Sequence, residues 1–256
     1  MIVIGGSPAQ PELLATLPSN GTEKQIVGIL SASAARYDYD SADQLKFELR
    51  LRSEIVGAAR SLDRSGMDFE IFRKSRCNPA YWNRTSEGGF VLKSGVSPSG
   101  AIRDIYRNGS RYATECATAM VIVYYGALLA VFGPNRFDRL FPRIELMNWH
   151  HLDRLLSDIG LMRKRPDYLA GDRRYFSNPD VDPLTPEWQG ENVIDLNGKL
   201  YYGHGAGLMN ADAMVRMLNE NRTDGATESA YLMDSAGYPD FKNLADVYAR
   251  VPDAPL

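Results

Sequence analysis

An uninterrupted apolar run in the middle of the chain, Ala119 to Phe132, constrains the fold more than any other feature. Glu115 precedes it, and Gly133-Pro134 closes it. A helix needs about 20 apolar residues to span a membrane. The run is shorter, and we therefore expect a buried core helix. The chain has 256 residues, which is enough to build a substantial core around such a helix.

Composition is ordinary for a soluble globular protein, with 44% apolar and 24% charged residues. The net charge of −3 is too small to favour nucleic acid or an anionic membrane as a partner. The basic cluster Arg163-Lys164-Arg165 is interpreted as a solvated loop. The N-terminus lacks the basic start of a signal peptide. We expect neither a signal peptide nor a membrane-spanning segment.

Two cysteines, Cys77 and Cys116, do not make a disulfide framework, and a reducing compartment is the default expectation. No spacing of cysteine and histidine matches a metal site, and no calcium-binding loop occurs. We therefore expect neither a metal nor a cofactor.

Local patterns predict one domain of mixed, segregated helices and strands, the α+β class. Residues 1–40 are predicted to contain a short strand and a polar segment that leads to the next helix. A possible capping box at Ser41 opens an amphipathic helix that stops at Ser65-Gly66. Further elements are predicted as strands at 67–72, 143–149 and 173–179, a strand pair joined at 86–89, a helix after Ser99, a hairpin around Asn197-Gly198, and a helix from Asn210 to Leu218.

Cys116 has two interpretations. At a helix N-terminus, backbone N–H groups and the helix dipole favour the nucleophilic thiolate. Free cysteine is also among the most buried residue types, and from position alone a small core residue is the better interpretation. Glu115 opposes the dipole, because a neighbouring carboxylate raises the pKa of a thiol. It would help only as a base or an orienting group, and a solvated first-turn acid is the simpler interpretation.

A cysteine nucleophile needs a base, and two residues later in the chain compete for that role. His204 follows the predicted hairpin, where papain-like enzymes place a histidine. Glu191 lies at the base of the hairpin strand, beside Trp188 and Asn192, where desolvation would raise its pKa toward that of a useful base. A core or loop histidine and a turn carboxylate remain the plain alternatives.

Six motifs occur together in the order that one family shows them. They are CNPAYWNRTSEGGF (77–90), AIRDIYRNG (101–109), TECATAM (114–120), YFSNP (175–179), EWQGENVI (187–194) and YYGHG (201–205). On these motifs the sequence resembles the small protein-glutamine gamma-glutamyltransferases, or transglutaminases, of the spore coat of Bacillus-type bacteria. The resemblance extends over about residues 40–235.

The resemblance implies a papain-like (NlpC/P60-type) core within a single domain over residues 1–256, with the nucleophile at the N-terminus of a buried helix that packs on an antiparallel sheet. It implies Cys116 as the nucleophile, Glu191 as the base and Glu115 as a residue able to share that role. It also implies calcium-independent cross-linking, through a cysteine thioester, of glutamine and lysine side chains on spore coat proteins. The enzyme would be a monomer, located in the cytoplasm of the mother cell and associating with the coat.

Supporting or pocket roles are expected for His204, Asn192, Trp188, Trp149, Tyr201 and Tyr202. Plain packing is the alternative for each aromatic residue. The segment 150–170 is longer and more basic than the family pattern, and about 30 N-terminal and 20 C-terminal residues match weakly. No role is carried over to these parts.

Two other functions stay open from sequence. A cysteine amidase or peptidase would use the same core and nucleophile but transfer the acyl group to water. A catalytically silent coat-assembly protein would keep Cys116 as a structural residue.

Overall fold

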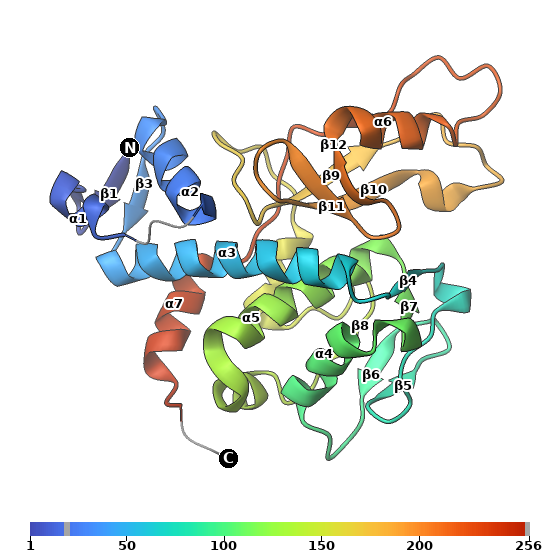
Figure 1. Ribbon diagram of the computed structural model, residues 1–256, viewed down its shortest axis with the longest axis horizontal. Helices are drawn as coiled ribbons and strands as arrows, with labels where there is room; N and C mark the ends of the chain where they lie inside the picture. Colours follow the sequence, from blue (N-terminus) through green and yellow to red (C-terminus); the bar gives the residue numbers. More distant parts are fainter. Residues whose placement is uncertain (18–20, 254–256) are drawn as a thin grey trace.

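Two long helices packed along each other form the centre of the molecule (Figure 1). The structure, a computed structural model, describes residues 1–17 and 21–253. Helix α3 (Ala42–Asp63) crosses the middle of Figure 1, and α5 (Cys116–Leu140) lies below it. Helices α4 (Pro98–Arg107) and α7 (Phe241–Arg250) pack against α5 and α3. The described part leaves out residues 18–20 and the last three residues. Residues 18–20 belong to the segment 1–40, which was predicted as a short strand and a polar segment.

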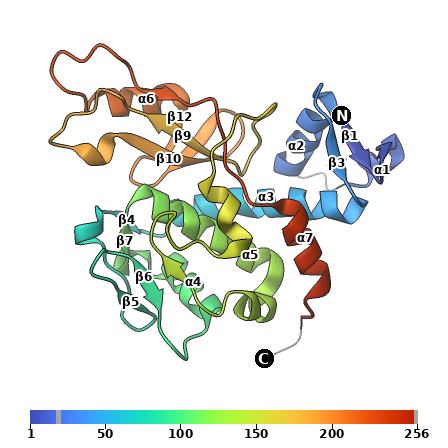
Figure 2. The same ribbon diagram turned by 180° about the vertical axis from the view of Figure 1, so that it is seen from behind.

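A five-stranded antiparallel sheet lies on one side of this helical pair (Figures 1 and 2). Its order is β12 (Gly207–Asn210), β11 (Leu200–Gly203), β10 (Gly190–Asp195), β9 (Arg173–Ser177) and β13 (Tyr231–Leu232). Strand β10 contacts α5, while α6 (Ala211–Asn219) covers the opposite face. A small second core fills the space between the sheet and α6. The helix that begins at Cys116 is therefore buried and packed on an antiparallel sheet, as predicted.

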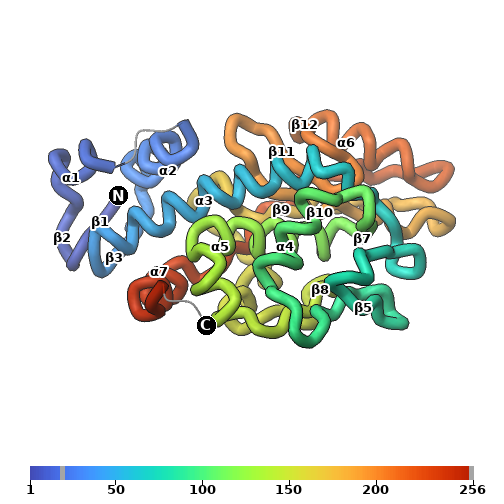
Figure 3. Tube along the Cα trace, turned by 60° about the horizontal axis from the view of Figure 1, so that its bottom comes forward, coloured from blue at the N-terminus to red at the C-terminus, as the bar shows by residue number. Residues whose placement is uncertain are grey.

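Three smaller sheets complete the fold. The N-terminal one is made of β1 (Ile2–Ile4), β2 (Ser7–Pro8) and β3 (Tyr37–Tyr39), accompanied by α1 (Pro11–Ala15) and α2 (Gly21–Ala32). This group lies at one end of α3, as Figure 3 shows. The others are β5 (Trp82–Arg84) with β6 (Phe90–Leu92) and β8 (Glu145–Leu146), and the parallel pair β4 (Asp68–Phe69) and β7 (Ala113–Thr114).

Helix α5 contains the apolar run. The helical backbone breaks at Gly133, which has φ 74°, and a second helical segment follows Pro134 to Leu140. The whole helix is long and apolar enough to cross a membrane by length and composition, yet 78% of its most apolar stretch is buried inside the fold. That burial agrees with the prediction of a core helix.

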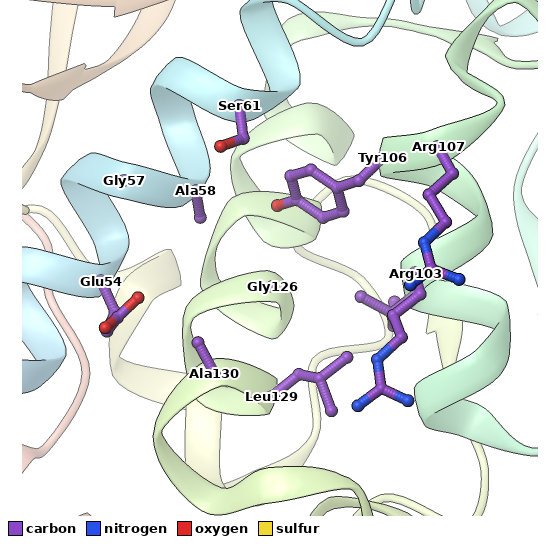
Figure 4. Close-up of a pocket in the computed structure, with 11 residues that line it drawn as sticks. Glu54, Gly57, Ala58, Ser61, Arg103, Tyr106, Arg107, Gly126, Leu129 and Ala130 are labelled. Atoms are coloured by element: carbon purple, nitrogen blue, oxygen red, sulfur yellow. The ribbon is translucent and has the colours of Figure 1, made fainter.

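A hollow of about 430 Å³ lies where α3, α4 and α5 meet (Figure 4). Small residues on α3 and α5 line it, including Gly57 and Gly126. Tyr106 extends from α4 toward α5 and donates a hydrogen bond to the backbone oxygen of Ile122. A Cβ atom at Gly126 would lie 2.2 Å from the Tyr106 hydroxyl oxygen. Glycine at this position thus permits the close approach of α4 to α5.

Most predicted elements are present, with four corrections. Residues 1–40 contain two helices as well as strands, and α2 buries Ile26 and Leu30, one helical turn apart. Ser97, not Ser99, caps α4, because Pro98 occupies its first position. The strands predicted at 67–72 and 143–149 shrink to the two residues each of β4 and β8.

Candidate active site

Cys116 is the first residue of α5, and Glu115 is its N-cap. The Glu115 carboxylate accepts hydrogen bonds from the Ala117 N–H at 2.5 Å, the Thr118 N–H at 2.7 Å and the Thr118 hydroxyl. The Glu115 carbonyl oxygen accepts from the Ala119 N–H at 3.1 Å. Three of the first four N–H groups of α5 are thereby bonded to Glu115. The interpretation of Glu115 as a solvated first-turn acid is wrong, since it is a half-buried cap.

Glu191 lies on β10 beside this helix start and is only 2% exposed. A Cβ atom at Gly203, on the neighbouring strand, would lie 2.8 Å from the Glu191 Oε1 atom, and glycine there makes room for the carboxyl group. Among the described residues, Oε1 has no hydrogen-bond partner. Burial, reinforced by the negative charge of Glu115, raises the pKa of Glu191 well above its usual value. Hydrogen bonds with the Cys116 thiol and the His204 backbone N–H lower the pKa of Glu191 and offset part of this increase.

The Cys116 thiol is held between these carboxyl groups and Asn192. The Asn192 Nδ2 atom donates to the Cys116 Sγ atom at 3.5 Å. Burial raises the pKa of the Cys116 thiol, and Glu191 and Glu115 raise it further, while the amide groups of Asn192 lower it. Burial also raises the pKa of Glu115, against the effect of its hydrogen bonds. One thiol and two carboxyl groups thus compete for the same protons.

His204 is buried but engaged elsewhere. Its Nδ1 atom lies 3.1 Å from the Tyr202 hydroxyl, and its Nε2 atom lies 3.0 Å from the Asp68 carbonyl oxygen. A carbonyl oxygen only accepts, and Nε2 therefore carries the proton while Nδ1 accepts from Tyr202. Burial lowers the pKa of His204 to about 4, so that the ring is neutral at pH 7. Both nitrogens are thus occupied away from the sulfur.

A pocket of about 760 Å³ opens onto Cys116. Its walls include Glu115, Asn148, Trp149, Arg173, Tyr175, Asn192, Phe69, Phe72 and Glu187. Of the aromatic residues expected near the walls, Trp149 lines the pocket. Trp188 instead stacks on Phe69, with ring centroids 6.0 Å apart. Tyr201 packs edge-on against Phe176 in the second core, and Tyr202 is buried in the main core.

Sequence reasoning missed Arg173 and Tyr175 as pocket residues. Both lie on β9, which was predicted as a strand, and Tyr175 pairs directly with Asn192 of β10. Residues opposite each other on antiparallel strands point to the same face. Aligning the two predicted strands would have placed Tyr175 next to Asn192, but nothing in the sequence specifies that register.

The family model described as protein-glutamine gamma-glutamyltransferase matches residues 1–248. Relatives with that name include a protein of Bacillus mycoides (strain KBAB4), 44% identical over 91% of this chain and 84% of its own length. Another, from Bacillus cereus (strain AH820), is 41% identical over 100% of this chain and 91% of its own length. The chain belongs to the protein-glutamine gamma-glutamyltransferase family. It is a transglutaminase by this membership.

A solved structure supports the same assignment at the level of the fold. The transglutaminase from Geobacillus stearothermophilus, without its C-terminal extension, is 47% identical and superimposes with a TM-score of 0.76. The match covers 82% of this chain and 99% of that chain. The mixed helix-and-sheet fold described above is thus that of a bacterial transglutaminase.

Proposed function

We propose that the protein cross-links other proteins through a thioester on Cys116. The Cys116 sulfur attacks the γ-carboxamide carbon of a glutamine side chain, and ammonia leaves. A lysine ε-amine then attacks the thioester carbon and displaces the sulfur, which forms an ε-(γ-glutamyl)lysine bond. The observation that carries the proposal is the cluster at the pocket: one thiol at a helix start with two carboxyl groups of raised pKa beside it.

Glu191 is proposed as the main base. It accepts the thiol proton as sulfur attacks, passes a proton to the leaving ammonia, and later takes one from the incoming lysine amine. A carboxylate of ordinary pKa is a weak base toward a thiol, and burial brings the pKa of Glu191 closer to the range this transfer needs. The position of His204, bonded to Tyr202 and Asp68, supports Glu191 over the histidine.

Glu115 is proposed as a second, weaker base. Its two oxygens already accept three hydrogen bonds at the start of α5. These bonds favour its charged form, and its charge in turn favours a proton on Glu191 or on the thiol. Glu115 therefore acts mainly by setting the proton affinity of its neighbours.

The backbone N–H of Cys116 is proposed as the oxyanion donor. It is the one N–H group in the first four of α5 that does not bond to Glu115. A fixed donor at a helix start stabilises the negative oxygen of a tetrahedral intermediate. Walls that contain Trp149 and Tyr175 limit the access of water, which would otherwise give deamidation.

The wider biological role is part of the same proposal. A papain-like core within one domain over residues 1–256, a monomeric state, calcium-independent activity and substrates in the spore coat follow from the family resemblance. The sequence has no calcium-binding loop, which supports calcium-independent activity. We place the protein in the mother-cell cytoplasm, associating with the coat.

Incorporation of a labelled primary amine into a glutamine-containing protein tests the function. We expect incorporation that a calcium chelator leaves unchanged and that Cys116→Ala abolishes in a folded variant. Release of ammonia without amine incorporation, at any amine concentration, would assign the protein to the cysteine amidases. Absence of both products would assign it to the silent coat-assembly proteins.

A further inference from the structure

Arg173 is a buried cation with no anionic partner. It is 3% exposed on β9, and no carboxylate within residues 1–17 and 21–253 lies at ion-pair distance from it. Burying an arginine without a carboxylate is costly, and such residues are usually paired. Arg52, by contrast, is equally buried but paired with Glu48 and Asp172. Among the described residues, Arg174 is also buried without a carboxylate at ion-pair distance, but only Arg173 of the two lines the pocket that opens onto Cys116.

Three contacts hold the Arg173 guanidinium in one position. Its Nε atom donates to the Ile159 carbonyl oxygen at 2.7 Å, and its Nη1 atom donates to the Asn192 Oδ1 atom at 2.7 Å. Its central carbon lies 4.2 Å from the centre of the Trp149 ring, a cation–π contact. Trp149 directly precedes the 150–170 segment, and Ile159 lies within it. The sequence analysis assigned no role to this segment. This segment thus supports the wall of the active site.

The contact with Asn192 decides which way its carboxamide points. A guanidinium has only donors, and therefore the oxygen of the carboxamide must face Arg173. The amide nitrogen then faces the other way, toward the Cys116 Sγ atom at 3.5 Å. With the amide reversed, the oxygen would face the sulfur and repel the negative charge of a thiolate.

We propose that Arg173 is a positioning residue of this active site, which holds the Asn192 carboxamide so that its N–H stabilises the Cys116 thiolate. This inference rests on the proposed role of Cys116 as nucleophile. Glu115, Glu191, Tyr175 and Arg173 interact electrostatically with the sulfur. Arg73 and Glu187 line the same pocket. Of these groups, Glu115 and Glu191 are the ones that a thiolate must overcome. Both disfavour the thiolate, and a donor fixed by a cation counteracts them.

The test is the pH dependence of Cys116 alkylation by iodoacetamide in a Cys77→Ser background, which leaves a single thiol. We expect Arg173→Met to move the midpoint of alkylation upward by about one pH unit, a roughly tenfold slower reaction at a given pH below the midpoint. In amine incorporation, kcat should fall more than KM rises.

Arg174→Met is the matched control. Arg174 is the next residue of β9, is 5% exposed, donates to the carbonyl oxygens of Ser235 and Met233, and stacks on Tyr168. Its loss should lower stability in a similar way but leave the alkylation midpoint unchanged. An equal midpoint in the Arg173→Met and Arg174→Met variants would overturn the inference.

Asn192→Ala tests the route through the amide and serves if Arg173→Met does not fold. We expect the same upward shift in Asn192→Ala, and no further shift when Arg173→Met is added. An unshifted midpoint in Asn192→Ala, or additive shifts in the double variant, contradicts the inference. Failure of the proposed function is distinguishable, because it appears as absent amine incorporation in the wild type, or as incorporation that survives Cys116→Ala, whatever the alkylation midpoints are.

Discussion

Glu191 lies on β10 and His204 directly follows the neighbouring strand β11, and the two side chains have different surroundings. Glu191 has a free oxygen beside the thiol, whereas both nitrogens of His204 are bonded to other groups. A base must reach the proton that it moves. At the scale of single residues, the hydrogen-bond partners of these two side chains therefore support the proposal of Glu191, rather than His204, as the base.

The first prediction compares the two directly. Glu191→Gln removes the proposed base and should lower kcat by about 10²- to 10⁴-fold, with residual activity from Glu115. His204→Gln should cost much less activity in the folded protein. Steady-state kinetics of amine incorporation, with folding checked by circular dichroism, measures both. A larger loss in the His204 variant would show that Glu191 is not the base.

The second prediction concerns stability and pH. The pKa of His204 is about 4 in the folded protein, below the ~6.5 expected in an unfolded chain. The unfolded state therefore binds the extra proton between these values, and this contribution to stability is present above pH 6.5 and lost as pH falls toward 4. The full difference corresponds to about 3 kcal/mol.

Urea unfolding of the wild type and His204→Gln at pH 7 and pH 4 measures this contribution. We expect the wild type to lose more stability than the variant over this interval. Parallel losses would mean that the histidine is not held neutral in the folded state.

At the scale of the elements, the packing of α4 on α5 depends on Gly126. A Cβ atom there would meet the Tyr106 hydroxyl at 2.2 Å, and Tyr106 is fixed by its bond to Ile122. Gly126→Ala should therefore destabilise the protein by about 1–3 kcal/mol.

Gly57→Ala is the control on α3, at the opposite wall of the same hollow (Figure 4), where a Cβ atom would meet nothing within 4 Å. It should stabilise the protein by about 0.5–1 kcal/mol, because alanine favours a helix interior. The unfolding temperatures of the two variants test this explanation. If both substitutions changed the unfolding temperature in the same direction, a steric clash with Tyr106 would not explain the effect at Gly126.

The sequence predicted those elements whose ends are marked by a capping residue or a turn motif. Ser41 and Asn210 cap helices as expected, and Asn197-Gly198 forms its hairpin turn, both residues having positive φ. The prediction for residues 1–40 missed both helices. Helix α1 has only five residues and no side-chain cap, and the proline at its start was not enough to identify it. At the proposed active site, local physics left Cys116 undecided and offered both His204 and Glu191 as the base, and the family motifs favoured Glu191. Arg173 was missed because its role depends on the register between β9 and β10.

At the scale of the whole molecule, Arg52 joins three parts of the fold. From α3 it bonds Glu48 on its own helix and Asp172 just before β9, each at 2.7 Å. Its guanidinium also stacks on Phe241 of α7, 4.4 Å from the ring centre. The helical pair, the five-stranded sheet and the C-terminal helix thus meet at one buried cation.

Arg52→Met should destabilise the protein by about 3–5 kcal/mol, since it leaves Glu48 and Asp172 buried without their cation. Arg50, two residues earlier and exposed, provides the control, and Arg50→Met should stay within about 0.5 kcal/mol of wild type. Chemical denaturation measures both values. Equal effects of the two substitutions would show that the buried network contributes little.

The thioester on Cys116 is the central chemical claim, and intact mass spectrometry tests it most directly. The protein is incubated with a glutamine peptide in the absence of amine, and the mass of the chain is followed. We predict an increase equal to the peptide minus ammonia, located on Cys116, absent from Cys116→Ala and removed when a primary amine is added. An adduct on another residue, such as Cys77, or cross-linking by the Cys116→Ala variant, would contradict it.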